Sequence, residues 1–180
     1  MENNLTSADG FDNEAFFNAV DARRRKQQLT WPALARGIWE QSHVLNERRN
    51  DHPISPVTIR KMGDRGGVSC QHALFLLRWL GVPPERFIAE PKPGTAGIAL
   101  PAADDSQRLR WNLRQLYGVV DAARTARGTT WQQAAEHIRC TPSQLTGLRT
   151  AKFATGMVLA MRITQALRRP AADFVYAADW

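Results

Sequence analysis

Apolar side chains recur at helical spacing through most of the chain. Between residues 106 and 128 they fall three or four positions apart and so line one face of a helix; they are Leu109, Leu113, Leu116, Val120 and Ala123. Ser106 is a suitable N-cap for this helix and Gly128 a suitable end. We find no convincing alternation of apolar and polar residues with a period of two, so we predict an all-α chain.

Three shorter helices are predicted after this one. Thr130 caps the first of them. Thr141-Pro142, an N-cap followed by proline at the first helical position, begins the next one. A last helix spans about 155–167. The apolar positions that we expect to face the core are Ala135, Ile138, Leu145, Leu148, Val158, Leu159, Ile163 and Leu167.

The chain contains an internal repeat. The tripeptide at 20–22 recurs at 120–122, and Thr30-Trp31 recurs as Thr130-Trp131. A shorter offset further on aligns residues 76–87 with residues 163–174. We predict two diverged copies of one unit of four to five helices, over residues 10–89 and 106–180. Residues 90–105 are rich in Pro, Gly and Ala and are typical of a linker with little regular structure.

The two copies differ between their second and third helices. In the first copy the apolar stripe that includes Ile38 continues through Trp39 and Leu45, so we predict that this helix runs on for about two further turns. A polar loop over 46–53 then precedes Ser55-Pro56. The second copy keeps a turn of about four residues at this place.

Charge points to a polyanionic partner. The formal net charge is +7 and the isoelectric point is about 10.2. Residues 91–180 carry 12 basic and 6 acidic side chains, whereas residues 1–90 carry 12 and 11. The second copy is therefore where a nucleic acid or another polyanion is expected to bind.

The stretch Thr130-Trp-Gln-Gln-Ala-Ala-Glu-His-Ile-Arg-Cys-Thr-Pro-Ser-Gln-Leu-Thr-Gly-Leu148 resembles the helix-turn-helix of the lambda-repressor-like (XRE) family of DNA-binding domains. It has a polar N-cap, a small residue in mid-helix at Ala135 and an apolar closing residue at Ile138. The resemblance covers about residues 115–175 and extends to the closing segments of both copies. It implies two tandem helix-turn-helix units of the kind found in bacterial transcriptional regulators.

The resemblance also implies a binding surface, because the helix after the turn enters the major groove in this family. The groove-facing positions that it implies are Pro142, Ser143, Thr146 and Gly147, after the N-cap Thr141. The amide of Gln144 offers a donor and an acceptor together, so this residue is a candidate for reading adenine. Thr130 at a helix N-terminus, and Arg149 and Lys152 beyond the second helix, are candidates for phosphate contacts.

The candidates for DNA contact at the corresponding helix of the first copy are Ser55, Val57, Arg60 and Lys61. The side chains that we expect to point outward there are Val57, Thr58, Arg60 and Lys61. Two uses of this copy stay open, because the inserted loop departs from the compact turn of the family. It either contacts DNA or packs against the second copy or another chain.

Other chemistries find less support. Cys70 and Cys140 belong to no paired metal-ligand motif, so we expect no metal, no cofactor and no catalysis. Trp31 and Trp131 lie beside the core stripe, where packing is favoured over stacking on a base. No secretory signal or membrane-spanning run is present, which is typical of a cytoplasmic protein.

The leading hypothesis is a sequence-specific protein that binds double-stranded DNA and regulates transcription by occupying an operator. It would act as an internal pseudo-dimer or as a homodimer. The alternative is a protein-interaction adaptor that keeps the helical scaffold without reading DNA. Binding of single-stranded DNA or RNA is a weaker option, because no aromatic platform on strands is predicted.

Overall fold

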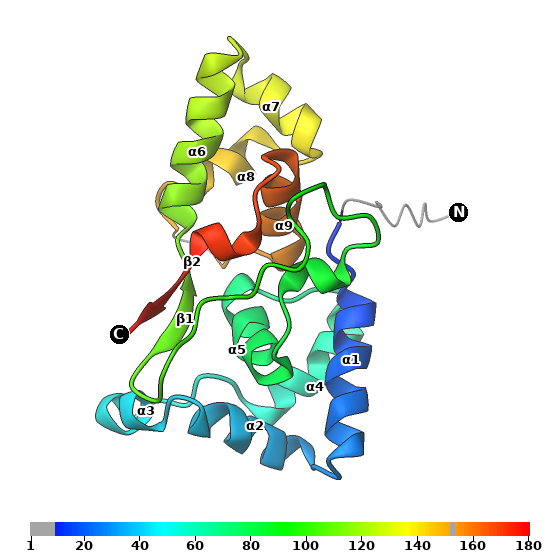
Figure 1. Ribbon diagram of the computed structural model, residues 1–180, viewed down its shortest axis with the longest axis vertical. Helices are drawn as coiled ribbons and strands as arrows, with labels where there is room; N and C mark the ends of the chain where they lie inside the picture. Colours follow the sequence, from blue (N-terminus) through cyan, green and yellow to red (C-terminus); the bar gives the residue numbers. More distant parts are fainter. Residues whose placement is uncertain (1–9, 152–153) are drawn as a thin grey trace.

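A computed structural model describes residues 10–151 and 154–180 of the chain (Figure 1). Over these residues the chain is mostly helical, as predicted, with two short paired strands that were not predicted. The first part contains α1 (Asn13–Lys26), α2 (Trp31–Glu40), α3 (His43–Arg49), α4 (Pro56–Arg65), α5 (Cys70–Leu80) and η1 (Pro84–Phe87). The second contains β1 (Arg108–Trp111), α6 (Leu113–Ala126), α7 (Trp131–Ile138), α8 (Pro142–Gly147), α9 (Met157–Ala166), η2 (Ala171–Phe174) and β2 (Val175–Ala178).

Apart from α3, the same series of helices occurs twice, and equivalent residues cap equivalent helices. Asp12 and Asn112 each accept a hydrogen bond from a backbone N–H in the first turn of α1 and α6. Thr30 and Thr130 cap α2 and α7 in the same way, and Ser55 and Thr141 cap α4 and α8. Each cap satisfies an N–H group that has no partner within its own helix.

The repeated tryptophans pack rather than stand free. The Arg24 guanidinium lies 4.3 Å from the Trp31 ring centre and also donates to Asp21 and to the backbone of the α1–α2 turn. Phe17 stacks on the same indole. In the second copy the equivalent contacts to Trp131 come from Arg124, at 4.8 Å, and from Tyr117. The contacts of both indoles with a guanidinium and an aromatic ring confirm the prediction of a packing role.

The prediction that the chain has no strand, and that a helix begins after Ser106, is wrong. Residues 108–111 pair antiparallel with 175–178, and Leu109 and Trp111 are buried on this two-stranded sheet. The helix begins only at Leu113, because the side chain of Asn112 caps it by accepting from the N–H of Gln115. A strand of four residues is too short to show an alternating pattern, and Leu109 fits the helical spacing by coincidence.

The predicted continuous helix in the first copy is divided in two. Helix α2 ends at Glu40 and α3 begins at His43. Ser42 between them has non-helical φ and ψ of −137° and 40°, and its hydroxyl donates to the carbonyl oxygen of Gln107 at 2.6 Å. Leu45 is nevertheless buried, as its place in the stripe predicted.

The two copies meet around an approximate two-fold axis. The Cys70 N–H donates to the Thr155 carbonyl oxygen at 2.9 Å, and the Met157 N–H donates to the Val68 carbonyl oxygen at 2.8 Å. These bonds form an antiparallel bridge between Ser69 and Gly156, which are equivalent positions in the repeat. A half-turn about the viewing direction of Figure 1 carries α6 onto α1, α7 onto α2 and α8 onto α4.

The linker, residues 90–105, has no helix or strand, as predicted, and both of its ends are held. Arg78 donates to the carbonyl oxygens of Ala103 and Asp104 at 2.7 and 3.0 Å. The side-chain oxygen of Gln165 accepts from the backbone N–H of Lys92 at 2.7 Å, and buried Thr95 lies against it. Arg78 and Gln165 are equivalent in the repeat, so the same helical position in each copy holds one end of the linker.

A buried arginine joins α3 to β1. The Arg108 side chain, 4% exposed, donates to Asp51 at 2.8 Å and to the amide oxygen of buried Asn46. The hydrogen bond from Arg108 lowers the pKa of the Asp51 carboxyl. The insertion in the first copy is therefore attached to the first strand of the second copy.

Arg108→Ala is expected to lower the free energy of unfolding by about 2–3 kcal/mol, because it leaves Asn46 buried without its partner; the partial exposure of Asp51 keeps the loss below that of a fully buried pair. Arg49→Ala, at an exposed neighbouring arginine, should cost less than about 0.5 kcal/mol. Chemical denaturation measures both. Equal losses would contradict a role for the buried hydrogen bonds.

Glu85 predicts a pH dependence of stability. It is buried between the copies, where one carboxylate oxygen accepts from the Ala171 N–H at 2.6 Å, and burial raises its pKa. Stability should therefore fall as pH rises from the ordinary glutamate pKa of 4.5, which applies to the unfolded chain, through the higher folded pKa. Glu85→Gln should match the wild type below that range, become progressively more stable than it as pH rises through the range, and keep a constant advantage above it. A difference between the two proteins that does not change with pH would refute this.

Candidate nucleic-acid interface

Helices α7 and α8 meet through a junction of three residues, 139–141. Arg139 has a left-handed conformation with φ of 60°, and the Arg162 side chain from α9 donates to its carbonyl oxygen at 3.0 Å. Cys140 is half-buried beside it. Sequence reasoning missed Arg162, because nothing local links it to a turn 23 positions away.

Both helices begin with a reciprocal cap. The Thr130 hydroxyl accepts from the Gln133 N–H at 3.2 Å, while the Gln133 side chain accepts from the Thr130 N–H at 2.8 Å. Thr141 and Gln144 make the same pair of bonds at 3.2 and 2.8 Å. Each capping box satisfies two backbone donors and fixes where its helix starts.

Helix α8 has one buried side and one exposed side. Leu145 and Leu148 are buried, as predicted. Ser143, Thr146 and Gly147 are exposed and, at spacings of three and four, share one side of the helix. Pro142 is half-buried at its start. The structure thus brings four of the predicted groove-facing positions together at the exposed side and N-terminus of one short helix.

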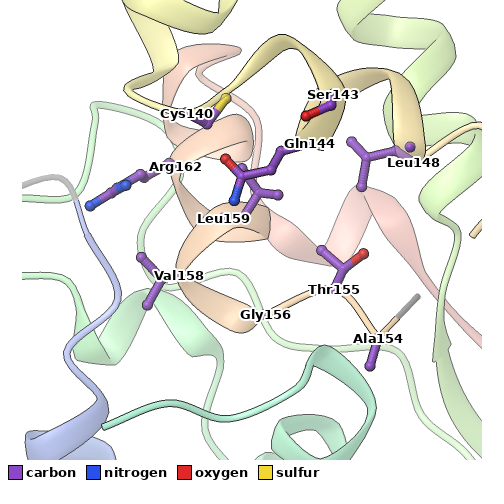
Figure 2. Close-up of a pocket in the computed structure, with 11 residues that line it drawn as sticks. Cys140, Ser143, Gln144, Leu148, Ala154, Thr155, Gly156, Val158, Leu159 and Arg162 are labelled. Carbon is purple, nitrogen blue, oxygen red and sulfur yellow. The ribbon is translucent and has the colours of Figure 1, made fainter.

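Gln144 has a second use that its spacing alone did not reveal. Its side-chain oxygen is bound in the capping box, and a bidentate contact with adenine needs that same oxygen as acceptor. The side chain also lines a pocket of about 510 Å³ between α8 and α9, together with Leu159 (Figure 2). Reading adenine through Gln144 would therefore require this oxygen either to accept from the base and from the Thr141 N–H at once, or to leave the capping box.

The remaining predicted contacts of the second copy surround this helix. Thr130 is exposed at the start of α7, where its hydroxyl hydrogen is available to a phosphate because the oxygen serves as the acceptor in the cap. Arg149 is exposed just beyond α8. Lys152 lies outside the described residues. Three arginines of this half have acidic partners instead: Arg108 with Asp51, Arg124 with Asp121 and Arg169 with Asp173.

The corresponding helix of the first copy, α4, exposes different chemistry. Ser55 caps it, accepting from the Thr58 N–H at 3.0 Å, and Val57 is 57% exposed. Arg60 and Lys61 are exposed further along. Where the second copy has a three-residue junction, this copy has α3 and a pocket of about 560 Å³ lined by Trp39 and residues 52–56, among others.

The cysteines are poor nucleophiles. Burial raises the pKa of the Cys70 thiol to about 12, and burial also raises the pKa of Cys140. Within residues 10–151 and 154–180, no three His, Cys, Asp or Glu side chains gather as metal ligands. In the same part of the chain, no helix combines the length and apolar character needed to cross a membrane.

No protein-family model, curated protein or solved structure matches this chain.

Gly147→Ala is expected to raise the free energy of unfolding by about 0.5 kcal/mol, because glycine costs a helix backbone entropy. Its φ is not positive, and an added Cβ would meet nothing within 4 Å. Gly118→Ala in α6, where a Cβ is equally unhindered, should give a similar gain. Thermal and chemical denaturation test the pair. Destabilisation by Gly147→Ala alone would mean that this part of α8 is not helical in solution.

Proposed function

We propose that the chain binds double-stranded DNA sequence-specifically and regulates transcription by occupying an operator, with α8 in the major groove. The observation that carries this proposal is the α7–α8 pair. Two capped helices are joined by three residues, the apolar side of the second is buried, and its polar side is exposed. This arrangement supports the assignment of a helix-turn-helix, in which the second helix supplies the base contacts.

In this proposal the exposed side of α8 reads bases and its surroundings hold the backbone. Ser143 and Thr146 offer hydroxyl groups to base edges, and Gly147 lets the helix lie close to the groove. Thr130, at the positive end of the α7 dipole, contacts a phosphate, and Arg149 neutralises another. The two helical units are proposed to be tandem, lambda-repressor-like domains, with the strand pair as an addition.

The salt dependence of duplex binding tests the placement of this surface. Arg149→Ala should weaken binding and reduce the slope of log K against log salt concentration by about one, because each phosphate contact releases close to one counterion. Arg86→Ala, exposed on η1 outside both helix pairs, is the matched control and should leave the slope unchanged. Fluorescence anisotropy with a labelled duplex over a series of salt concentrations gives both values.

Three outcomes have different meanings. An unchanged slope in Arg149→Ala, with binding intact, would move the site away from α8. An equal reduction in both variants would show only a loss of general charge. A wild-type protein with no affinity for duplex DNA at moderate salt would favour the alternative, an interaction adaptor built on the same scaffold.

A further inference from the structure

The two equivalent helices, α4 and α8, are related by the same approximate half-turn as the rest of the copies. The antiparallel bridge between Ser69 and Gly156 joins equivalent residues and so sets this relation. A half-turn keeps equivalent elements at equal height along its axis, and in the view of Figure 1 α4 and α8 lie on opposite sides of α5 and α9.

The copies are held in this relation by contacts within the chain. The bridge between Ser69 and Gly156 lies where equivalent residues meet, and α5 contacts its equivalent, α9. Arg78 and Gln165 hold the two ends of the linker, and Arg108 holds α3 to β1. At the approximate two-fold axis the two copies of one chain contact each other. A second chain is therefore not needed to present a second reading helix.

The exposed side chains at equivalent positions of the two helices are chemically unlike. Val57 stands where α8 has Ser143, Arg60 where it has Thr146, and Lys61 where it has Gly147. An exposed valine fits a thymine methyl group, and arginine or lysine fits the two acceptors of guanine. Hydroxyl groups and glycine favour neither. The two helices would therefore prefer different base sequences.

We infer that one chain binds one duplex through both copies, at a bipartite site whose two blocks differ in sequence and lie at a single fixed spacing. This inference rests on the proposed function and extends it, since it names the form of the DNA. The contacts with the phosphates would be related by two-fold symmetry about the midpoint of the site, while the base sequences would not be.

Selection of bound sequences from a random duplex pool, with the full chain, tests this directly. We expect two unlike blocks at one spacing, and a mass measurement of the complex should give one chain per duplex. Insertion of about five base pairs between the blocks turns one of them to the opposite side of the helix. Affinity should then fall to that of a single block.

Reciprocal substitutions assign each block to its helix. Arg60→Thr gives α4 the residue that α8 carries, and Thr146→Arg gives α8 the residue of α4. Both positions are exposed, so the fold should be retained. Arg60→Thr should change only one block of the selected sequence, and Thr146→Arg only the other.

The possible failures are distinguishable. A single block, unaffected by Arg60→Thr, would overturn the inference and leave DNA binding by α8 standing. A palindromic site that holds two chains would overturn it as well. The absence of any enriched sequence and of any duplex binding would overturn the proposed function, and the inference with it.

Discussion

The antiparallel bridge between Ser69 and Gly156 is the contact on which the arrangement of the molecule depends. It joins equivalent positions of a repeated unit, and such a contact is satisfied only when the two copies are related by a local half-turn. Once this relation is set, α5 meets α9 and packs against β1 of the second copy. Two units that each bury a limited apolar surface thereby share one continuous core.

Local chemistry made the helices predictable. Each capping residue lies immediately before an apolar stripe, and Thr141-Pro142 gives both an N-cap and a preset φ at the next residue. The repeat supplied a second, independent reading of each element. The repeat also argues against a helix that begins just after Ser106, because Asn112 is equivalent to Asp12, and Asp12 caps α1. The buried side of α8, with Leu145 and Leu148, followed from spacing alone.

The features that sequence did not predict depend on distant partners. The strand at 108–111 exists because residues 175–178 lie beside it, and the break at Ser42 is accompanied by a bond to Gln107, 65 positions away. The second use of Gln144 was visible in principle, since a threonine followed three residues later by glutamine marks a capping box. A polar side chain near an N-cap serves the backbone first, because that donor is always present.

The insertion in the first copy, α3 and the residues after it, fixes the first copy against the second. This helps to explain why the two copies differ in sequence. Helix α3 supplies Asn46 and the segment after it supplies Asp51, and both bind Arg108 in the first strand of the second copy. The insertion lengthens the junction between α2 and α4, which in the second copy is only three residues long. Because the insertion also fixes one unit against the other, the fold can accommodate the longer junction between α2 and α4, provided that the exposed side of α4 stays accessible. Under the proposed function, the contacts between the two units set the position of α4 relative to α8. Within the second copy, the short junction has the corresponding role and sets the position of α8 relative to α7. Selection on the first copy would then act on its contacts with the second copy as much as on the bases that it contacts. Unlike residues at the equivalent positions Arg60 and Thr146 are therefore expected.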